Sequence, residues 1–158
     1  MKLSKEEKAY VAGFLDGDGS IHVRLKPNLT YRYRFQISPA VVFYQSDKES
    51  SHLEWLQKMI NRGYLRKRND GIIEYILGDV ESIRELIKNI LPYLRLKQKQ
   101  AKLMLEILEM KRKIKNAKDF LKLAQKIDMF QKMNYSKKRI QNSLEVKKTL
   151  IKEGLLAP

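Results

Sequence analysis

An apolar stretch of this chain runs directly into two carboxylates, and this junction constrains the fold more than any other feature. Residues 11–19 read Val-Ala-Gly-Phe-Leu-Asp-Gly-Asp-Gly. The C-terminal end of a helix carries partial negative charge, so a carboxylate there is normally disfavoured. Because Asp16 and Asp18 both lie at this end, we expect something positive to compensate them, and a divalent metal ion is the obvious candidate. Gly17 and Gly19 let the backbone leave the helix sharply and let another chain or a ligand approach closely.

The charge of the chain favours a polyanionic partner. Its 158 residues include 33 Lys and Arg against 18 Asp and Glu, a net charge of +15. Residues 111–158 hold 14 of the basic residues and only 4 acidic ones, so the excess is concentrated there. Nucleic acid is the most economical partner for such a chain. Ribosome-like and membrane-surface proteins share the same excess, so charge alone does not decide between these classes.

Composition also limits the compartment and the kind of metal site. The chain has no cysteine, which excludes disulfides and thiolate metal sites. Residues 1–7 lack the apolar core of a signal peptide, and no apolar run approaches the length that spans a bilayer. We therefore expect an intracellular protein with no membrane partner. An organelle (chloroplast or mitochondrion) and a prokaryotic cytoplasm remain open as locations.

Local patterns predict helices that alternate with pairs of strands. Ser4 and Glu7 form a capping box, which predicts a helix from about Lys5 to about Leu15. The further expected elements are strands at 20–26 and 32–43, a helix at 52–61, a hairpin of 63–68 and 72–77, a helix from Asp79 to Leu94, and helices at about 98–113, 117–133 and 142–153. The order α-ββ-α-ββ-α followed by helices predicts one α+β domain over residues 1–158, with the helices of about 98–153 packed on it.

The aspartate pair fits two simpler structures only in part. The alternate spacing of Asp16, Asp18 and Ser20 imitates a calcium loop, which also needs Gly at its sixth position and Glu at its twelfth. Ile21 and Pro27 stand at those positions, so the calcium loop is excluded. A plain polar turn would not need small residues in the helix before it. This helix nevertheless contains three that would let a second helix pack unusually close, namely Ala9, Ala12 and Gly13.

The motif at 11–19 resembles, position for position with conservative changes, the nine-residue signature of the LAGLIDADG homing endonucleases. The likeness is in particular to the single-motif, homodimeric members encoded within group I introns. It covers most of the chain, with the C-terminal helices matching loosely. The other matching positions are Ser20-Ile21, Lys26-Pro27-Asn28, Tyr31, Gln36, Gln45, Gly63-Tyr64, Tyr75-Ile76-Leu77, Pro92-Tyr93-Leu94 and Leu96-Lys97-Gln98-Lys99-Gln100-Ala101. Together these are specific, whereas an isolated Asp-Gly-Asp-Gly would not be. The resemblance implies the homing-endonuclease fold, with a saddle-shaped antiparallel sheet.

The resemblance implies that two motif helices, one per subunit, pack together and bring one metal-binding aspartate each to adjacent scissile phosphates. By position that ligand is Asp18, while Gly17 contributes its backbone carbonyl and Asp16 is a helix-end residue. The implied dimer-interface residues are Ala9, Ala12, Gly13 and Asp16. Mg²⁺ is the implied cofactor; Mn²⁺ is expected to substitute for it, and Ca²⁺ to bind without supporting cleavage. Because one carboxylate per chain cannot build a symmetric two-metal site, the chain needs a second copy of itself.

Three further positions match the surroundings of the family's active site. Lys97 would stabilise the phosphate electrostatically, although composition alone favours a solvated lysine at a helix start. Gln45 would order water. The third position usually holds a basic residue, but an ungapped alignment places Glu49 there. Lys48 is one residue away and His52 lies across a short insertion, and we favour Lys48.

In the family, the antiparallel sheet lies in the major groove, where its outward side chains read base edges. The implied DNA-binding residues are Arg24, Lys26, Asn28, Tyr31, Arg34, Gln36, Ser38, Tyr44, Arg66, Arg68, Glu74 and Lys99. Ala40, Val42 and Ile76 fall on the same surface by position. They either contact thymine methyl groups or, if the register is shifted by one residue, belong to the core. Ser136, Lys137 and Lys138 match a loop that holds phosphates and positions the duplex without reading it.

The resemblance therefore implies a site-specific endonuclease that cuts a long, pseudo-palindromic double-stranded DNA target as a homodimer and leaves short 3′ overhangs. An RNA-binding maturase that helps its intron to fold is one alternative, and a non-catalytic DNA-binding regulator with a vestigial metal centre is another. An intact Asp18 favours the nuclease over the maturase, since an RNA binder does not need this acid. Asp18, Gln45 and Lys97 together argue against the regulator.

Overall fold

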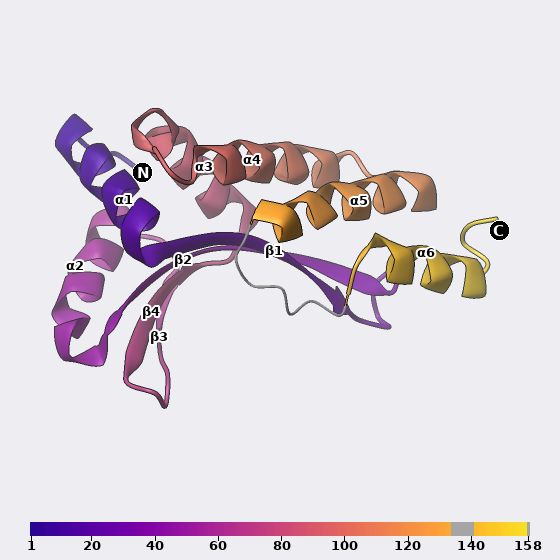
Figure 1. The fold of residues 1–158 in the computed structure, drawn as a ribbon, viewed down its shortest axis with the longest axis horizontal. Coiled ribbons are helices and arrows are strands. Elements are labelled where there is room, and N and C mark those ends of the chain that lie inside the picture. The colour runs from indigo at the N-terminus through magenta and orange to yellow at the C-terminus, as the bar shows by residue number, and fades with distance from the viewer. Residues whose placement is uncertain (134–140, 158) are drawn as a thin grey trace. The chain divides into compact units, whose positions relative to one another are not determined.

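The computed structural model describes residues 1–133 and 141–157, and its elements follow the predicted order (Figure 1). The elements are α1 (Lys5–Asp18), β1 (Gly19–Pro27), β2 (Phe35–Ser46), α2 (Ser50–Ile60), β3 (Tyr64–Lys67), β4 (Ile72–Leu77), α3 (Val80–Ile90), α4 (Gln98–Arg112), α5 (Ala117–Met133) and α6 (Ser143–Lys152), with 3-10 turns at Asp47–Glu49 and Leu91–Tyr93. This confirms the α+β class and the α-ββ-α-ββ-α order with C-terminal helices. In the described part of the chain, no helix has both the length and the apolar character needed to cross a bilayer.

Helix α1 begins as predicted and ends later than predicted. The Ser4 hydroxyl accepts a hydrogen bond from the Glu7 N–H at 3.2 Å, and the Glu7 carboxylate accepts one from the Ser4 N–H at 2.7 Å. The helix then continues past Leu15 to Asp18, and β1 starts at the next residue, as Figure 1 shows. A Cβ on Gly19 would lie 2.7 Å from the Leu15 carbonyl oxygen, so only glycine permits this immediate exit. The two aspartates therefore lie within the last turn of α1.

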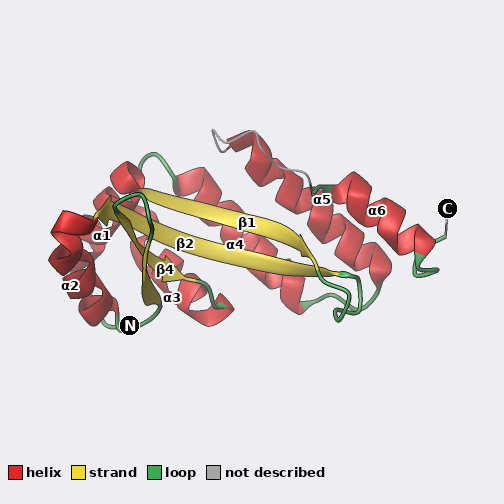
Figure 2. Ribbon diagram, turned by 90° about the horizontal axis from the view of Figure 1, so that it is seen from below, coloured by secondary structure: helices red, strands yellow, loops and turns green. Residues whose placement is uncertain are grey.

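The four strands form one sheet in the order β1-β2-β4-β3, and Figure 2 shows β2 lying between β1 and β4. In the antiparallel register Val42 is opposite Ile76, and Glu74 is opposite both Tyr44 and Arg66. Directly opposite residues share a face of the sheet. The predicted face is therefore correct and no shift of one residue is needed. Val42 and Ile76 are nevertheless only 4% and 6% exposed, so they belong to the buried part of this face and are not open to DNA.

Strand β2 begins at Phe35 rather than at residue 32. Arg34 has a φ of 62°, in the left-handed region, which no extended strand contains. The Asn28 N–H donates to the Arg34 carbonyl at 2.8 Å, and the Arg34 N–H donates to the Tyr31 carbonyl at 2.9 Å. These bonds close a turn over residues 28–34, and the three positions before Phe35 belong to that turn.

The chain divides into two compact units, each with its own apolar core. The first unit comprises residues 1–22 and 39–102, and the second comprises residues 23–38 and 103–158. Fully buried side chains of the first unit include Val11, Leu15, Phe43, Leu53, Tyr75, Ile83 and Ile87. Those of the second unit include Val23, Met104, Ile107, Leu123, Ile127, Phe130 and Leu150. All of the candidate catalytic residues belong to the first unit.

Candidate active site

The carboxylate of Asp16 is buried at the end of α1 and is satisfied by backbone amides. Its Oδ2 accepts hydrogen bonds from Arg95 N (2.6 Å) and Leu96 N (3.2 Å), and its Oδ1 accepts one from Lys97 N (2.9 Å). These N–H groups precede α4, where the positive end of a helix favours a carboxylate. The compensation that the sequence demands for Asp16 is therefore this set of amides rather than a metal. The carboxylate is bonded within the chain, as expected of the helix-end residue that the resemblance implies.

Lys97 is held against the same end of α1. Its Nζ donates a hydrogen bond to the backbone carbonyl of Asp16 at 2.6 Å. Partial burial lowers the pKa of this lysine, while the charges of Asp16 and Asp18 act in the opposite direction and raise it. The structure thus brings Lys97 and Asp18 together, as the resemblance implies. A freely solvated lysine at a helix start would show neither the bond nor the burial.

Asp18 is exposed at the last position of α1, next to the exposed Gly17. A carboxylate and a backbone carbonyl are both oxygen ligands, the kind that hard divalent cations such as Mg²⁺ prefer. These two residues therefore fit a divalent ion by the chemistry of their donors. Among the described residues, no group of three or more His, Asp or Glu side chains is placed to hold a metal. One chain thus offers part of a coordination shell, centred on Asp18.

The two faces of α1 differ in packing. Val11, Ala12 and Leu15 are fully buried against the chain's own core. Ala9, Gly13 and Gly17, spaced one turn apart, are exposed, and a Cβ on either glycine would meet no atom within 4 Å. Ala12 was expected at a dimer interface, but it packs inside the chain because the helical period places it beside the inward Val11 and Leu15.

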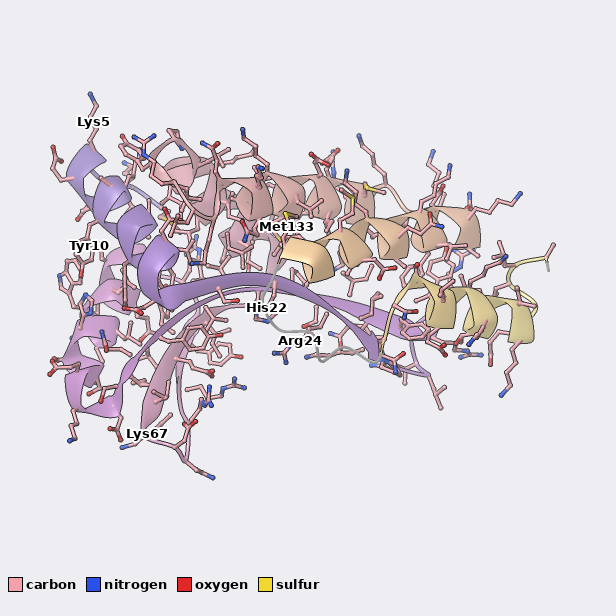
Figure 3. All side chains as sticks on the ribbon, viewed as in Figure 1. Lys5, Tyr10, His22, Arg24, Lys67 and Met133 are labelled. Carbon is pink, nitrogen blue, oxygen red and sulfur yellow. The ribbon has the colours of Figure 1, made fainter. Side chains whose placement is uncertain are left out.

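The remaining catalytic candidates lie on β2, on the turn after it and on α2. Gln45 is half-buried, and its side-chain oxygen accepts a hydrogen bond from Ser46 N at 3.0 Å. Lys48 is exposed in the turn Asp47–Glu49. His52 belongs instead to an aromatic cluster, which the local pattern did not reveal: its ring is 4.9 Å from that of Phe14, and its Nε2 bonds to the hydroxyl of Tyr10, labelled in Figure 3. This arrangement keeps Lys48 as the favoured basic candidate.

On the β3–β4 hairpin, Glu74 is only 3% exposed, and its carboxylate pairs with two arginines. It accepts hydrogen bonds from Arg66 Nε at 2.6 Å and from Arg68 Nη1 at 3.5 Å, and Arg68 also pairs with Asp70. Glu74 was expected to contact DNA. Its burial and its two cationic partners make it a support for Arg66 and Arg68 instead.

In the second unit, the predicted alternation of β1 is observed. The exposed Arg24 and Lys26 alternate with the buried Val23 and Leu25, and Figure 3 shows Arg24 on the side of β1 away from α5. Tyr31 is exposed, and Asn28, Gln36 and Ser38 are partly exposed. Arg34 is the exception, because its guanidinium donates to Glu153 at 2.7 Å and to the Leu29 carbonyl at 2.6 Å. Arg34 is therefore engaged in closing the 28–34 turn. Ser136, Lys137 and Lys138 lie outside the described residues.

A family model and two curated relatives match the sequence of this chain. The family model described as LAGLIDADG endonuclease matches residues 11–108. DNA endonuclease I-CreI of Chlamydomonas reinhardtii is 36% identical over 150 residues, covering 94% of this chain and 91% of the relative. DNA endonuclease I-CvuI of Chlorella vulgaris is 36% identical over 111 residues, covering 70% and 67%.

The fold of this chain is similar to solved structures of homing endonucleases. The homing endonuclease I-CvuI, crystallised in complex with the I-CreI target in the presence of Mg and with its DNA not cleaved, superposes with a TM-score of 0.93 at 30% identity, covering 97% of this chain and 98% of that one. The archaeal intron-encoded homing endonuclease I-Vdi141I in complex with DNA has a TM-score of 0.85 at 16% identity, covering 96% and 98%. At this lower identity the likeness concerns the fold alone.

Proposed function

Since the chain belongs to the LAGLIDADG endonuclease family, we propose that it is a site-specific double-stranded DNA endonuclease. It cleaves a long, pseudo-palindromic target as a homodimer and leaves short 3′ overhangs. The observation that carries this proposal is the exposed carboxylate of Asp18 at the end of α1, with the half-buried ammonium of Lys97 held beside it. A carboxylate that can hold a divalent ion, with an ammonium beside it, suits phosphodiester hydrolysis, because negative charge accumulates on the phosphate in this reaction.

The proposed cofactor is Mg²⁺, held by the Asp18 carboxylate and the Gly17 carbonyl. When bound, a divalent ion stabilises negative charge on the phosphate and on the leaving oxygen. Lys97 adds a second positive charge there, Gln45 orders water, and Lys48 supplies the basic group near the turn after β2. Crystal structures of I-CvuI obtained with Mg and with Ca support the use of a divalent ion. We expect Mn²⁺ to substitute and Ca²⁺ to bind without cleavage.

The proposed dimer joins the exposed faces of two α1 helices. The stripe of Ala9, Gly13 and Gly17 supports this contact, because the distance between packed helices depends on the side chains between them. Close packing would place the two Asp18 residues near each other, one for each DNA strand. A second copy therefore completes a site for which one chain supplies a single exposed aspartate.

The proposed DNA contacts come from each unit separately. The first unit offers Tyr44, Arg66, Arg68 and Lys99, and the second offers Arg24, Lys26, Asn28, Tyr31, Gln36 and Ser38, with the phosphate loop at Ser136, Lys137 and Lys138. Arginine and lysine suit guanine, whereas asparagine and glutamine suit adenine. Cleavage would promote copying of a host intron, in an organelle or a prokaryotic cytoplasm.

The test is cleavage of a library of double-stranded DNA sites, screened in Mg²⁺, in Ca²⁺ and in EDTA. We expect one family of pseudo-palindromic sites to be cut in Mg²⁺ only. Asp18→Asn should lower the cleavage rate by about 10³-fold or more while target affinity in Ca²⁺ is retained. Asp70→Asn is the matched control, since Asp70 also precedes a glycine but lies in the β3–β4 turn, and it should still cleave.

Three outcomes would contradict the proposal. A fully active Asp18→Asn variant would show that the metal assignment is wrong. A wild-type protein that binds a DNA site in Mg²⁺ without cutting it would be a regulator, and one that binds only a structured intron RNA would be a maturase.

A further inference from the structure

Both the backbone N–H and the side-chain ammonium of Lys97 are bound by one residue, Asp16. The lysine N–H donates to Asp16 Oδ1 at 2.9 Å, and the lysine Nζ donates to the Asp16 carbonyl oxygen at 2.6 Å. From this double anchorage we propose that Asp16 is a positioning residue for the nuclease reaction, which sets the place of the Lys97 ammonium beside Asp18. The inference rests on the proposed function and deepens it.

The amides bound by Asp16 are outside the hydrogen-bond ladder of α4. Ala101 N donates to Lys97 O at 2.9 Å, so this ladder begins at the Lys97 carbonyl and cannot use the N–H groups of residues 95–97. These residues are neither helix nor strand. The Asp16 carboxylate receives all three N–H groups. It therefore fixes the backbone from which the lysine side chain starts.

Burial makes this anchorage effective. Asp16 is only 9% exposed, so its charge-assisted hydrogen bonds are poorly screened by water. A lysine side chain has a flexible four-carbon stem and a strongly hydrated ammonium. If its backbone were not fixed, the ammonium would sample many positions. Misplacing a catalytic group by about 1 Å can cost about 10²-fold in rate. The position of the Lys97 ammonium is thus expected to depend on the carboxylate of Asp16.

A double-mutant cycle between Asp16→Asn and Lys97→Met tests this dependence. The Asn side chain turns an NH₂ group toward the backbone amides, whereas Met keeps the length of lysine without its charge. We expect Asp16→Asn to slow single-turnover cleavage about 10²-fold in the wild-type background. In the Lys97→Met background it should slow cleavage by no more than about twofold, since the group that it positions is gone. Target affinity in Ca²⁺ and dimer content should stay at the wild-type level.

A second readout needs neither metal nor DNA. Amide hydrogen exchange in the free protein should become faster at residues 95–97 in Asp16→Asn, while Ala101 in α4 keeps its protection. If this variant does not fold, Asp16→Ser serves in its place, because its hydroxyl accepts one amide and presents no opposing NH₂ group. Unchanged exchange at residues 95–97 would overturn the anchorage itself.

Asp128→Asn is the matched control, since both oxygens of Asp128 accept the Ser143 N–H at 3.1–3.2 Å in the second unit. It should lower the melting temperature and show no coupling to Lys97→Met. If Asp16→Asn slows cleavage equally with and without the lysine, Asp16 is merely structural and the inference is wrong. A wild-type protein that cuts no DNA would overturn the proposed function instead, so the two failures are distinguishable.

Discussion

Helix α1 and the β3–β4 hairpin contain the same kinds of residue in opposite surroundings. A Cβ on Gly13 of α1 would meet nothing within 4 Å, whereas a Cβ on Gly63 at the start of the hairpin would lie 2.4 Å from the Ile76 carbonyl oxygen. The carboxylate of Asp18 is exposed, whereas that of Glu74 is buried between two arginines. The chain itself makes use of the glycine and the acid of the hairpin, but not of those in α1.

This difference separates residues that serve the fold from residues that are available to a partner. The close backbone contact and positive φ at Gly63 explain why glycine is needed there. The two arginines paired with Glu74 explain why a buried acid is tolerated there. Gly13 has open space where a Cβ would lie, and Asp18 is exposed even though the Lys97 ammonium lies near it, which is why a second copy and a metal ion are proposed for them. Substitutions in the two regions should therefore affect different measurements.

The largest effect is expected for Gly13→Leu in α1. A leucine there would wedge the two motif helices apart, at a cost of about 2–3 kcal/mol, which raises the dimer dissociation constant by about 30- to 150-fold. Sedimentation equilibrium measures this constant. Lys122→Leu, at an exposed position of α5, controls for the added apolar surface and should leave the dimer intact. A Gly13→Leu variant that remained a tight dimer would remove the proposed helix contact.

A loss of stability without loss of dimerisation is expected for Gly63→Ala in the hairpin. The methyl group would clash with the Ile76 carbonyl at a residue whose φ is +73°, which should cost about 2 kcal/mol of unfolding free energy. Urea denaturation measures the change. Asn61→Ala is the control for backbone strain alone, because Asn61 also has a positive φ of 54°, and it should cost about 1 kcal/mol. Equal losses at both positions would show that the clash relaxes freely.

The smallest effect is expected for Glu74→Gln. The neutral side chain leaves Arg66 without its carboxylate, whereas Arg68 keeps its pair with Asp70, and because both arginines are exposed to water the loss of stability should be only about 1 kcal/mol. The freed guanidinium of Arg66 should bind a phosphate more readily, so the salt dependence of DNA binding should steepen by about one unit in the log–log slope. Glu106→Gln, which breaks an exposed pair with Lys126, should change neither quantity measurably. An unchanged salt slope in Glu74→Gln would mean that Arg66 does not face DNA.

Much of the fold was predictable because its signals are local. The Ser4–Glu7 capping box, the alternation of β1 and the helical spacing of Ile83, Ile87 and Ile90 each concern neighbouring residues, and the corresponding elements are present. The boundaries failed where tertiary context overrides propensity. Gly17 and Gly19 predict an end to α1 at about Leu15, yet the helix continues to Asp18.

The candidate site was predictable only in part. The resemblance pointed to Asp18 and Lys97, and the structure brings them together. The amide partners of Asp16 lie 79–81 residues further along the chain, so no local pattern reveals them. The pairing of Glu74 with Arg66 and Arg68 was also not predictable. An acidic residue on a basic face of a sheet can either contact a DNA base or pair with neighbouring arginines, and the sequence pattern is the same in both cases.

The contact between Asp16 and residues 95–97 also has a consequence for protein synthesis. The aspartate leaves the ribosome about eighty residues ahead of its amide partners, at a rate of about 5–20 residues per second. Until those partners emerge, a charged carboxylate at the end of α1 lacks the donors that compensate it. The catalytic end of the helix should therefore be among the last parts of the first unit to become ordered in the nascent chain. A premature stop before residue 95 would leave a folding intermediate with the signature motif present and its lysine missing.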